Sequence, residues 1–182
     1  MKKTILILVL TTIAFYLNAQ ENSRKFDIKF GSGFGYITNV GINTFNIESD
    51  FNYKINKYFT AGLNLNSSGG NNSKNGYISN NFIAKNSTFA AANIFISPFG
   101  NNKYNNFKIG TGLAFILQTT TGFTGSGNIL INKPENTMGI NLIVEDEQII
   151  FSRFLIGGKL YLNQNMNSST LIGALVKIGY IF

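Results

Sequence analysis

The chain has 182 residues, of which 44% are hydrophobic and only 13% are charged. The charged share is about half that of an ordinary soluble domain, where it is roughly 25%. A chain of this length is most simply one domain. The absence of cysteine excludes disulfides and thiolate catalysis, and the absence of histidine excludes Ser-His-Asp triads and histidine-ligated zinc.

Residues 1–19 have the pattern of a secretory signal peptide. Lys2 and Lys3 form its positive start, an apolar run follows, and a small-residue cleavage site ends at Ala19. The apolar run is shorter than the roughly 20 residues that a membrane-spanning helix needs. We therefore expect cleavage, which leaves 20–182 as one mature domain.

The formal net charge is +7, and removing the two lysines of the signal lowers it to +5. Lysine and arginine are scattered singly along the chain, whereas nucleic-acid binding needs them in a cluster. The sequence therefore predicts no nucleic-acid partner. We expect the positive charge to attract anionic lipid phosphates rather than nucleic acid.

Most of the remaining chain alternates between apolar and polar residues, the pattern of a β-strand with two different faces. In 26–37, Phe30 and Phe34 share one face, and Lys29 and Gly31 share the other. Glycine weakens an ordinary strand, but inside a narrow barrel it leaves room for larger neighbours. The predicted strands are 26–37, 44–55, 58–66, 87–98, 107–117, 138–144, 149–162 and 171–182.

The connections between these strands differ in length, and their order gives an orientation. If the first strand rises from the periplasm, the short connections are periplasmic and the two longest are extracellular, as outer-membrane barrels prefer. The short connections are 56–57, 99–106 and 145–148, the last a solvated acidic turn, and the long ones are 67–86 and 118–137. Within 118–137, the alternative is that 128–132 extends one of the flanking strands.

These patterns predict an all-β fold, an eight-stranded antiparallel up-and-down transmembrane β-barrel in the cell outer membrane. A soluble barrel of the lipocalin kind shows the same alternation with its apolar face turned inward. The membrane version is favoured by export, by glycine and charge together on one face, by aromatic residues near strand ends and by the terminal Phe182. The closing strand 171–182 is expected to pair with 26–37.

Four stretches carry a family resemblance: Asn18-Ala19-Gln20, Gly31-Ser32-Gly33-Phe34-Gly35-Tyr36, the hairpin 55–62 and Gly179-Tyr180-Ile181-Phe182. They resemble small outer-membrane barrel proteins of Bacteroidetes type, distant relatives of the OmpA, OmpX and OmpW barrels. The resemblance implies the fold and an assembly route in which the barrel-insertion machinery reads Tyr180 and Phe182. It implies no catalytic residue. Because the chain has no tryptophan, tyrosine and phenylalanine would have to form the ring of aromatic residues at the membrane interface.

Charged side chains gather on the inward faces of the predicted strands. An eight-stranded interior is just wide enough for side chains, so we expect a buried polar network. The alternative is a narrow ion path that favours anions, because most of these groups are basic. The network residues are Asp27, Lys29, Glu48, Asp50, Lys54, Lys108, Arg153, Lys159 and Lys177.

Nothing in the sequence assembles an active site. Glu48 and Asp50 share a face, but the lysines beside them make salt bridging a better role than acid–base work or cation binding. Without histidine a Ser-Lys dyad stays formally open, and no serine is placed beside an inner lysine. The sequence predicts a non-enzyme with no catalytic residue, cofactor or metal.

The Asn-, Ser- and Gly-rich loop 67–86 is the most credible contact surface, with Lys74, Tyr77, Phe82 and Lys85 as candidates. We expect a monomer with a structural role or a surface-interaction role, as an adhesin or a binder of an envelope partner. Expected partners are outer-membrane lipid and lipopolysaccharide, the barrel-assembly machinery, and a surface or envelope protein. The alternatives are a small pore or transporter for ions or hydrophobic solutes, and an exported soluble lipocalin-like binding barrel.

Overall fold

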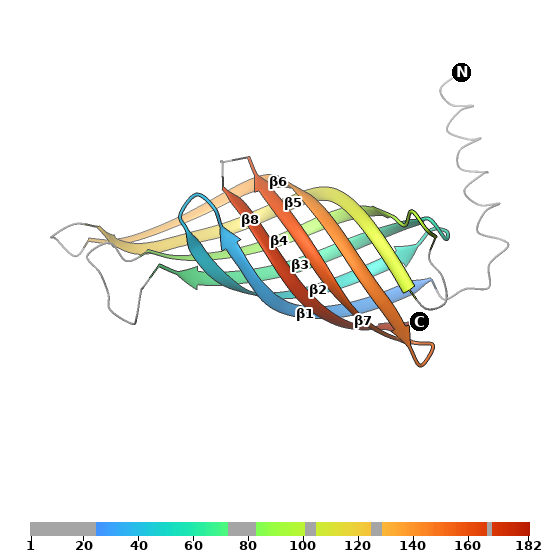
Figure 1. The fold of residues 1–182 in the computed structure, drawn as a ribbon. Coiled ribbons are helices and arrows are strands. Elements are labelled where there is room, and N and C mark those ends of the chain that lie inside the picture. The colour runs from blue at the N-terminus through green and yellow to red at the C-terminus, as the bar shows by residue number, and fades with distance from the viewer. Residues whose placement is uncertain (1–24, 73–82, 101–104, 125–128, 167–168) are drawn as a thin grey trace, which may run out of the picture.

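The computed structural model describes residues 25–72, 83–100, 105–124, 129–166 and 169–182, which form one closed β-barrel. Each strand pairs antiparallel with the next along the chain, and the last pairs with the first, so the predicted eight-stranded all-β fold is confirmed (Figure 1). The strands are β1 (Phe26–Ile37), β2 (Ile42–Lys54), β3 (Phe59–Asn71), β4 (Ile83–Ile96), β5 (Asn105–Thr124), β6 (Ile129–Ile150), β7 (Phe154–Asn165) and β8 (Thr170–Ile181). No helix in these residues is long and apolar enough to cross a membrane.

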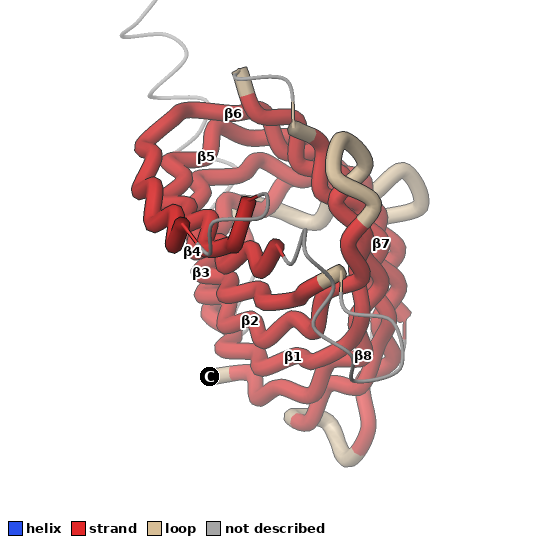
Figure 2. The backbone as a smooth tube through the Cα atoms, turned by 90° about the vertical axis from the view of Figure 1, so that its left-hand side faces the viewer, coloured by secondary structure: helices blue, strands red, loops and turns tan. Residues whose placement is uncertain are grey.

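The seam of the barrel lies between β1 and β8. Their register runs without interruption from Asp27 opposite Ile181 to Ile37 opposite Leu171. Figure 2 shows the ring of strands with β8 beside β1. The predicted pairing of the closing strand with 26–37 is confirmed, so neither strand has a free edge there.

The two faces of the sheet have opposite polarity. Large apolar side chains point outward, so that Phe34 is 74% exposed and Leu63 is 60% exposed, whereas Lys29 and Glu48 point inward and are each 1% exposed. A soluble lipocalin-like barrel needs the reverse arrangement. An apolar outer face is compatible with lipid. Closure of the barrel meets the second requirement of lipid, because it pairs the backbone groups of neighbouring strands.

Glycines on the inner face make room for aromatic rings, as the sequence predicts. A Cβ atom added to Gly173 would lie 2.4 Å from the ring of Tyr161, and one added to Gly110 would lie 2.5 Å from the ring of Phe95. Both rings belong to an apolar cluster inside the barrel. Its buried members are Ile37, Phe89, Ala91, Phe95, Ala114, Ile116, Ile143, Tyr161, Leu171 and Leu175.

The strands end at different heights at one end of the barrel, and we name the two ends by the residues that they carry. The terminal end carries Phe26 and Phe182, and the distal end carries the β1–β2 connection and the far ends of β5 and β6. Figure 1 shows β5 and β6 extending beyond the other strands at the distal end. The predicted loop 118–137 is therefore wrong over most of its length, because β5 continues to Thr124 and β6 begins at Ile129.

The other predicted long loop is also shorter than expected. β3 continues to Asn71 and β4 begins at Ile83, and the residues paired in this added stretch are polar or small. A strand that leaves the lipid band does not need an apolar outer face, so hydrophobic alternation stops before the strand does. This is why the hydrophobic pattern predicts strands that are too short at this end of the barrel.

The acidic turn predicted at 145–148 is wrong, since all four residues lie within β6. The chain reverses instead at Phe151 and Ser152, whose φ angles are +49° and +64°. The N–H of Arg153 donates to the C=O of Ile150 at 3.3 Å, which makes a two-residue hairpin of the type that needs positive φ at both central positions. Asn-Gly is the usual sequence there, so Phe-Ser gives no turn signal.

Candidate functional site: the lumen cluster

Four lysines and four carboxylates meet inside the barrel, and we call them the lumen cluster. They come from β1, β2, β5, β6, β7 and β8, and each is almost fully buried. Each sits at an inward position of its strand because side chains alternate between the two faces. The members are Lys29, Lys108, Lys159, Lys177, Glu48, Asp50, Glu145 and Glu147.

Glu145 and Glu147 hold two lysines on one side of the cluster. The Lys29 ammonium donates to Glu145 Oε2 at 2.8 Å and to Oε1 of Glu147. Lys108 Nζ lies 3.0 Å from Glu145 Oε2 and 2.8 Å from Glu147 Oε2. Each of these carboxylates therefore faces at least two cations, which offsets the cost of burying its charge.

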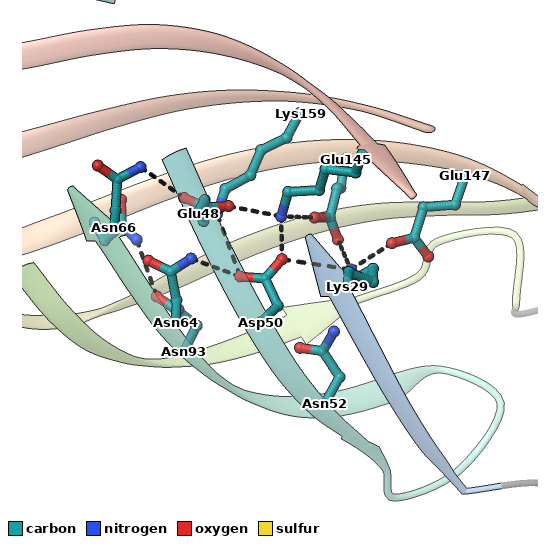
Figure 3. A network of polar contacts seen from close by, with 12 residues as sticks. Lys29, Glu48, Asp50, Asn52, Asn64, Asn66, Asn93, Glu145, Glu147 and Lys159 are labelled. Carbon is teal, nitrogen blue, oxygen red and sulfur yellow. Dashed lines mark hydrogen bonds and ion pairs between the residues drawn. The ribbon is translucent and has the colours of Figure 1, made fainter. Parts of the chain in front are cut away.

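Lys177 joins this group to the carboxylates of β2. Its ammonium lies 2.8 Å from Glu145 Oε1 and 2.7 Å from Glu48 Oε1, and it also donates to Asp50. Lys159 donates to Glu48 Oε1 at 2.6 Å. Figure 3 shows the two groups as one continuous network of contacts.

Asparagines on the inner faces of β2 and β3 donate further hydrogen bonds to the acids. Asn64 Nδ2 donates to Asp50 at 2.5 Å, Asn66 Nδ2 donates to Glu48 at 3.1 Å, and Asn52 Nδ2 donates to Asp27 at 2.7 Å. Sequence reasoning did not list these amides as part of the network. Their signal was present in the alternation of β2 and β3, which puts Asn52, Asn64 and Asn66 on the inward face.

The structure places most of the predicted network residues in the lumen. Asp27 is buried beside Asn52, and Lys54 is half-buried near the terminal end. Arg153 is a correction, because it lies exposed in the β6–β7 turn, where its Nη1 donates to the Tyr180 hydroxyl at 2.8 Å. The remaining predicted members are Lys29, Glu48, Asp50, Lys108, Lys159 and Lys177, all in the lumen cluster.

The corrected strand and turn change the charge of the interior. The predicted set has six basic and three acidic groups, which is the basis of the anion path. Removing Arg153 and adding Glu145 and Glu147, both 1% exposed, leaves five basic and five acidic groups among these residues. The lumen at this level is therefore balanced, and an excess of positive charge no longer favours anions there.

The arrangement suits structural bracing rather than chemistry. Each carboxylate of the cluster contacts at least one ammonium group within 3.0 Å, so none is an isolated base. Among the described residues there is no group of three or more acidic side chains arranged to hold a metal ion. A buried network whose charges are paired rigidifies its surroundings and holds the strands that supply it in one register.

The proposed assembly residues lie in an aromatic group at the terminal end. The Tyr180 ring is 5.1 Å from that of Phe182 and 5.3 Å from that of Phe154, both edge-on. Arg153 places its guanidinium 6.0 Å from the centre of the Tyr180 ring. Aromatic residues and a cation suit the boundary between hydrocarbon and water.

The candidate contact residues of the predicted loop separate into two groups. Lys74, Tyr77 and Phe82 lie outside the described residues. Lys85 is a correction, because it belongs to β4 and points into the barrel, where it is 6% exposed. It is part of the interior of the distal end rather than of a surface loop.

No protein-family model matches the sequence, and none of the curated proteins matches it. Solved structures do resemble the fold. Ail, the attachment invasion locus protein of Yersinia pestis, crystallised with the heparin analogue sucrose octasulfate, matches with a TM-score of 0.58 at 9% identity, over 87% of this chain and 97% of that one. Neisserial surface protein A matches with a TM-score of 0.58 at 12% identity, over 86% and 97%.

The outer-membrane protein OprG from Pseudomonas aeruginosa matches with a TM-score of 0.55 at 9% identity, over 88% of this chain and 97% of that one. At these identities the likeness concerns the fold alone. It agrees with the closed ring, the apolar outer face and the polar interior described above. The chain has the fold of the small bacterial outer-membrane β-barrels.

Proposed function

We propose that this chain is an outer-membrane β-barrel with a closed interior, and that its role is structural or one of surface contact. The lumen cluster carries the proposal, since four lysines and four carboxylates from six strands neutralise one another inside the barrel. Paired charges and the apolar cluster together fill a space that a pore would leave to water. The role we assign is non-enzymatic and needs no cofactor.

The distal end is the part that we assign to the exterior. There β5 and β6 pair with each other as far as Thr124 and Ile129, and the part of β6 before Gly139 pairs with no described strand on its other side. A neighbouring fold, Ail, has been crystallised with a sulfated sugar analogue, which supports surface contact as a use of this architecture. The partners we propose are lipopolysaccharide and membrane lipid, a surface or envelope protein, and the barrel-assembly machinery at Tyr180 and Phe182.

Conductance separates the closed barrel from the small pore. The purified protein, first checked for folding by heat-dependent gel migration, is added to planar bilayers under an applied voltage. We expect no steady stepwise current, because the charges of the lumen cluster are paired with one another. Reproducible steps from the unmodified protein would replace the closed interior with a pore.

Orientation is tested by cysteine labelling, which has no background because the chain contains no cysteine. Lys133 is exposed on the extension of β6, and Lys57 is exposed in the β2–β3 connection at the other end. We expect Lys133→Cys to react with a membrane-impermeant maleimide on intact cells. Lys57→Cys is the matched control and should react only after the outer membrane is permeabilised. The reverse pattern would invert the orientation.

A further inference from the structure

A broad groove crosses the outer face of the barrel from β2 to β6. It measures about 1250 Å³ including its open side. Small outward residues line it, namely Ala61 on β3, Ala92 on β4 and Thr111 on β5. Ala92 is the direct partner of both Leu63 and Leu113, so that a short side chain lies between two long ones. The groove is therefore a hollow in the apolar face of the sheet.

The groove rises from the terminal end toward the middle of the barrel. On β2 it begins at Tyr53, one residue before the strand ends at Lys54, whereas on β6 it reaches Ile140, far from the strand end at Ile150. With neighbouring strands about 4.8 Å apart, a row across five strands is about 19 Å long. One leaflet of the hydrocarbon core is about 15 Å thick. One acyl chain lying obliquely within a single leaflet would fit this length.

Aromatic rings form the wall of the groove at its terminal end. The Phe26 ring lies 5.6 Å from the ring of Phe51 and 4.9 Å from that of Tyr53, measured between ring centres. Both Phe51 and Tyr53 line the groove. Aromatic residues favour the boundary between hydrocarbon and water. This end of the groove therefore suits the depth of the lipid headgroups.

A cation lies beyond these rings, in the β2–β3 connection. Lys57 is exposed there, and its ammonium lies 4.9 Å from the centre of the Tyr58 ring. Asn56 orders the connection, because its Oδ1 accepts from the N–H of Tyr58 at 2.8 Å and from the N–H of Phe59 at 2.9 Å. Four residues span at most about 14 Å, so Lys57 lies within the reach of a headgroup from the groove at Tyr53.

We propose that the groove binds one phospholipid of the periplasmic leaflet, with an acyl chain along Ala61 and Ala92 and the phosphate at Lys57. The site rests on the proposed function, because this face meets acyl chains only if it spans the outer membrane in the assigned orientation. The apolar walls hold hydrocarbon, and the ammonium of Lys57 attracts the phosphate. A second barrel would present a convex, rigid face to the groove, whereas an acyl chain bends to follow it. The bound lipid exchanges more slowly than the lipids around the rest of the barrel.

The test is native mass spectrometry of the folded protein released from detergent micelles, with dipalmitoyl phosphatidylglycerol as the probe. We expect one lipid to be retained saturably. Dipalmitoylglycerol has the same chains without the phosphate and should bind about fivefold more weakly. Ala92→Leu fills the groove and should weaken retention about tenfold. Ala174→Leu is the matched control, because Ala174 is an outward alanine between Phe34 and Leu160 and does not line the groove, so retention should not change.

The headgroup contact is tested at Lys57. Lys57→Gln should weaken retention about fivefold, and Lys57→Arg should keep the wild-type affinity. Equal affinity of wild type and Lys57→Gln would overturn the place assigned to the phosphate. Equal retention by wild type and Ala92→Leu, or no saturable adduct, would overturn the groove as a lipid site. A dimer that Ala92→Leu dissociates would replace the lipid with a second copy of the chain.

Insertion into lipid vesicles, measured on the same samples, separates this site from the proposed function. A barrel that inserts but retains no phospholipid overturns the groove alone. A chain that stays folded in water without detergent and does not insert overturns the proposed function and the lipid site together.

Discussion

Glu145 and Asp146 are neighbouring acids on β6 whose side chains point to opposite faces of the barrel. Glu145 is buried among Lys29, Lys108 and Lys177, whereas Asp146 is exposed on the outer face. Adjacent residues of the same charge therefore have opposite surroundings. This pair gives a matched test of the lumen cluster.

We expect Glu145→Gln to lower the free energy of unfolding by about 3 to 5 kcal/mol, because it leaves the four buried ammonium groups of the lumen cluster facing only three carboxylates. Asp146→Asn is the control and should change it by less than about 1 kcal/mol. The measurement is urea unfolding of the protein refolded in lipid vesicles. Equal effects of the two substitutions would show that 145–148 is a solvated turn after all.

The lipid face is tested on one strand at two depths. Leu63 lies on the outer face within β3, and Phe59 lies on the same face at the start of the strand. Arginine at the middle of the bilayer costs about 2 to 4 kcal/mol, and near the interface the cost falls to about 0 to 1 kcal/mol. We therefore expect Leu63→Arg to destabilise the barrel in vesicles more than Phe59→Arg. Equal costs would mean that this face does not span a lipid bilayer.

At the level of the strand, the extension of β6 has an open edge, which the closed part of the barrel does not have. Residues before Gly139 pair only with β5 among the described strands, so the side of β6 toward β7 is open. The C=O of Met138 accepts from the N–H of Met166 at 3.0 Å, which shows that even-numbered residues of β6 present their backbone groups to this side. An open edge of this kind is a template for pairing with another chain.

Pro134 interrupts that edge. It is even-numbered, so its ring nitrogen faces the open side and offers no N–H to an incoming strand. The exposed Lys133 beside it adds a charge, which is paired with Glu135 at 2.7 Å. The hydrogen bond from Lys133 also lowers the pKa of the Glu135 carboxyl, which favours its ionised form.

We expect Pro134→Val to increase self-association, because it restores the missing donor and adds a β-branched residue to an open edge. Thr119→Val is the control, since Thr119 is the residue opposite Pro134 on β5 and does not lie on the open edge. Light scattering after size-exclusion chromatography in detergent measures the outcome. An unchanged mass for Pro134→Val would mean that proline is not what protects the edge.

Strands were predictable where one face meets lipid and the other meets the lumen. The bounds of β1 are the predicted 26–37, and those of β8 differ from the predicted 171–182 by one residue at each end. Prediction failed where that contrast disappears. Beyond the predicted end of the strand at residue 117, Thr119, Thr120 and Thr121 are part of β5, yet nothing apolar marks them as a strand. In β6, the outward Asp146 interrupts the apolar face, so that buried acids were mistaken for a turn.

The same error propagated from the strand to the site. The sequence placed Glu48, Asp50 and the inner lysines on one face, but it could not supply Glu145 and Glu147 while these belonged to a turn. The interior then seemed basic, and an anion path became a reasonable alternative. Pairing across the barrel depends on register between strands distant in the chain, which alternation within one strand does not encode.

At the level of the whole molecule, closure is the property on which the other features depend. The seam between β1 and β8 joins the two ends of the described chain, and Lys29 on β1 and Lys177 on β8 both contact Glu145 on β6. The lumen cluster therefore links both sides of the seam to a third strand. A barrel open at this seam would expose two edges to lipid, where unpaired backbone groups cost several kcal/mol each.

A cross-link across the seam tests closure in the folded protein. Phe34 and Ala174 are direct partners on β1 and β8, and both side chains point outward. Antiparallel partners have Cα atoms about 4.5 to 5.5 Å apart, which is within the range that a disulfide spans. Phe34→Cys combined with Ala174→Cys should therefore form an intramolecular disulfide on oxidation, seen as a mobility change that a reductant reverses. Phe34→Cys with Val144→Cys, whose side chain points outward from β6, is the control and should not cross-link. If the seam pair forms only disulfide-linked dimers, β1 and β8 do not meet within one chain, and the monomeric closed barrel is replaced by an assembly of open sheets.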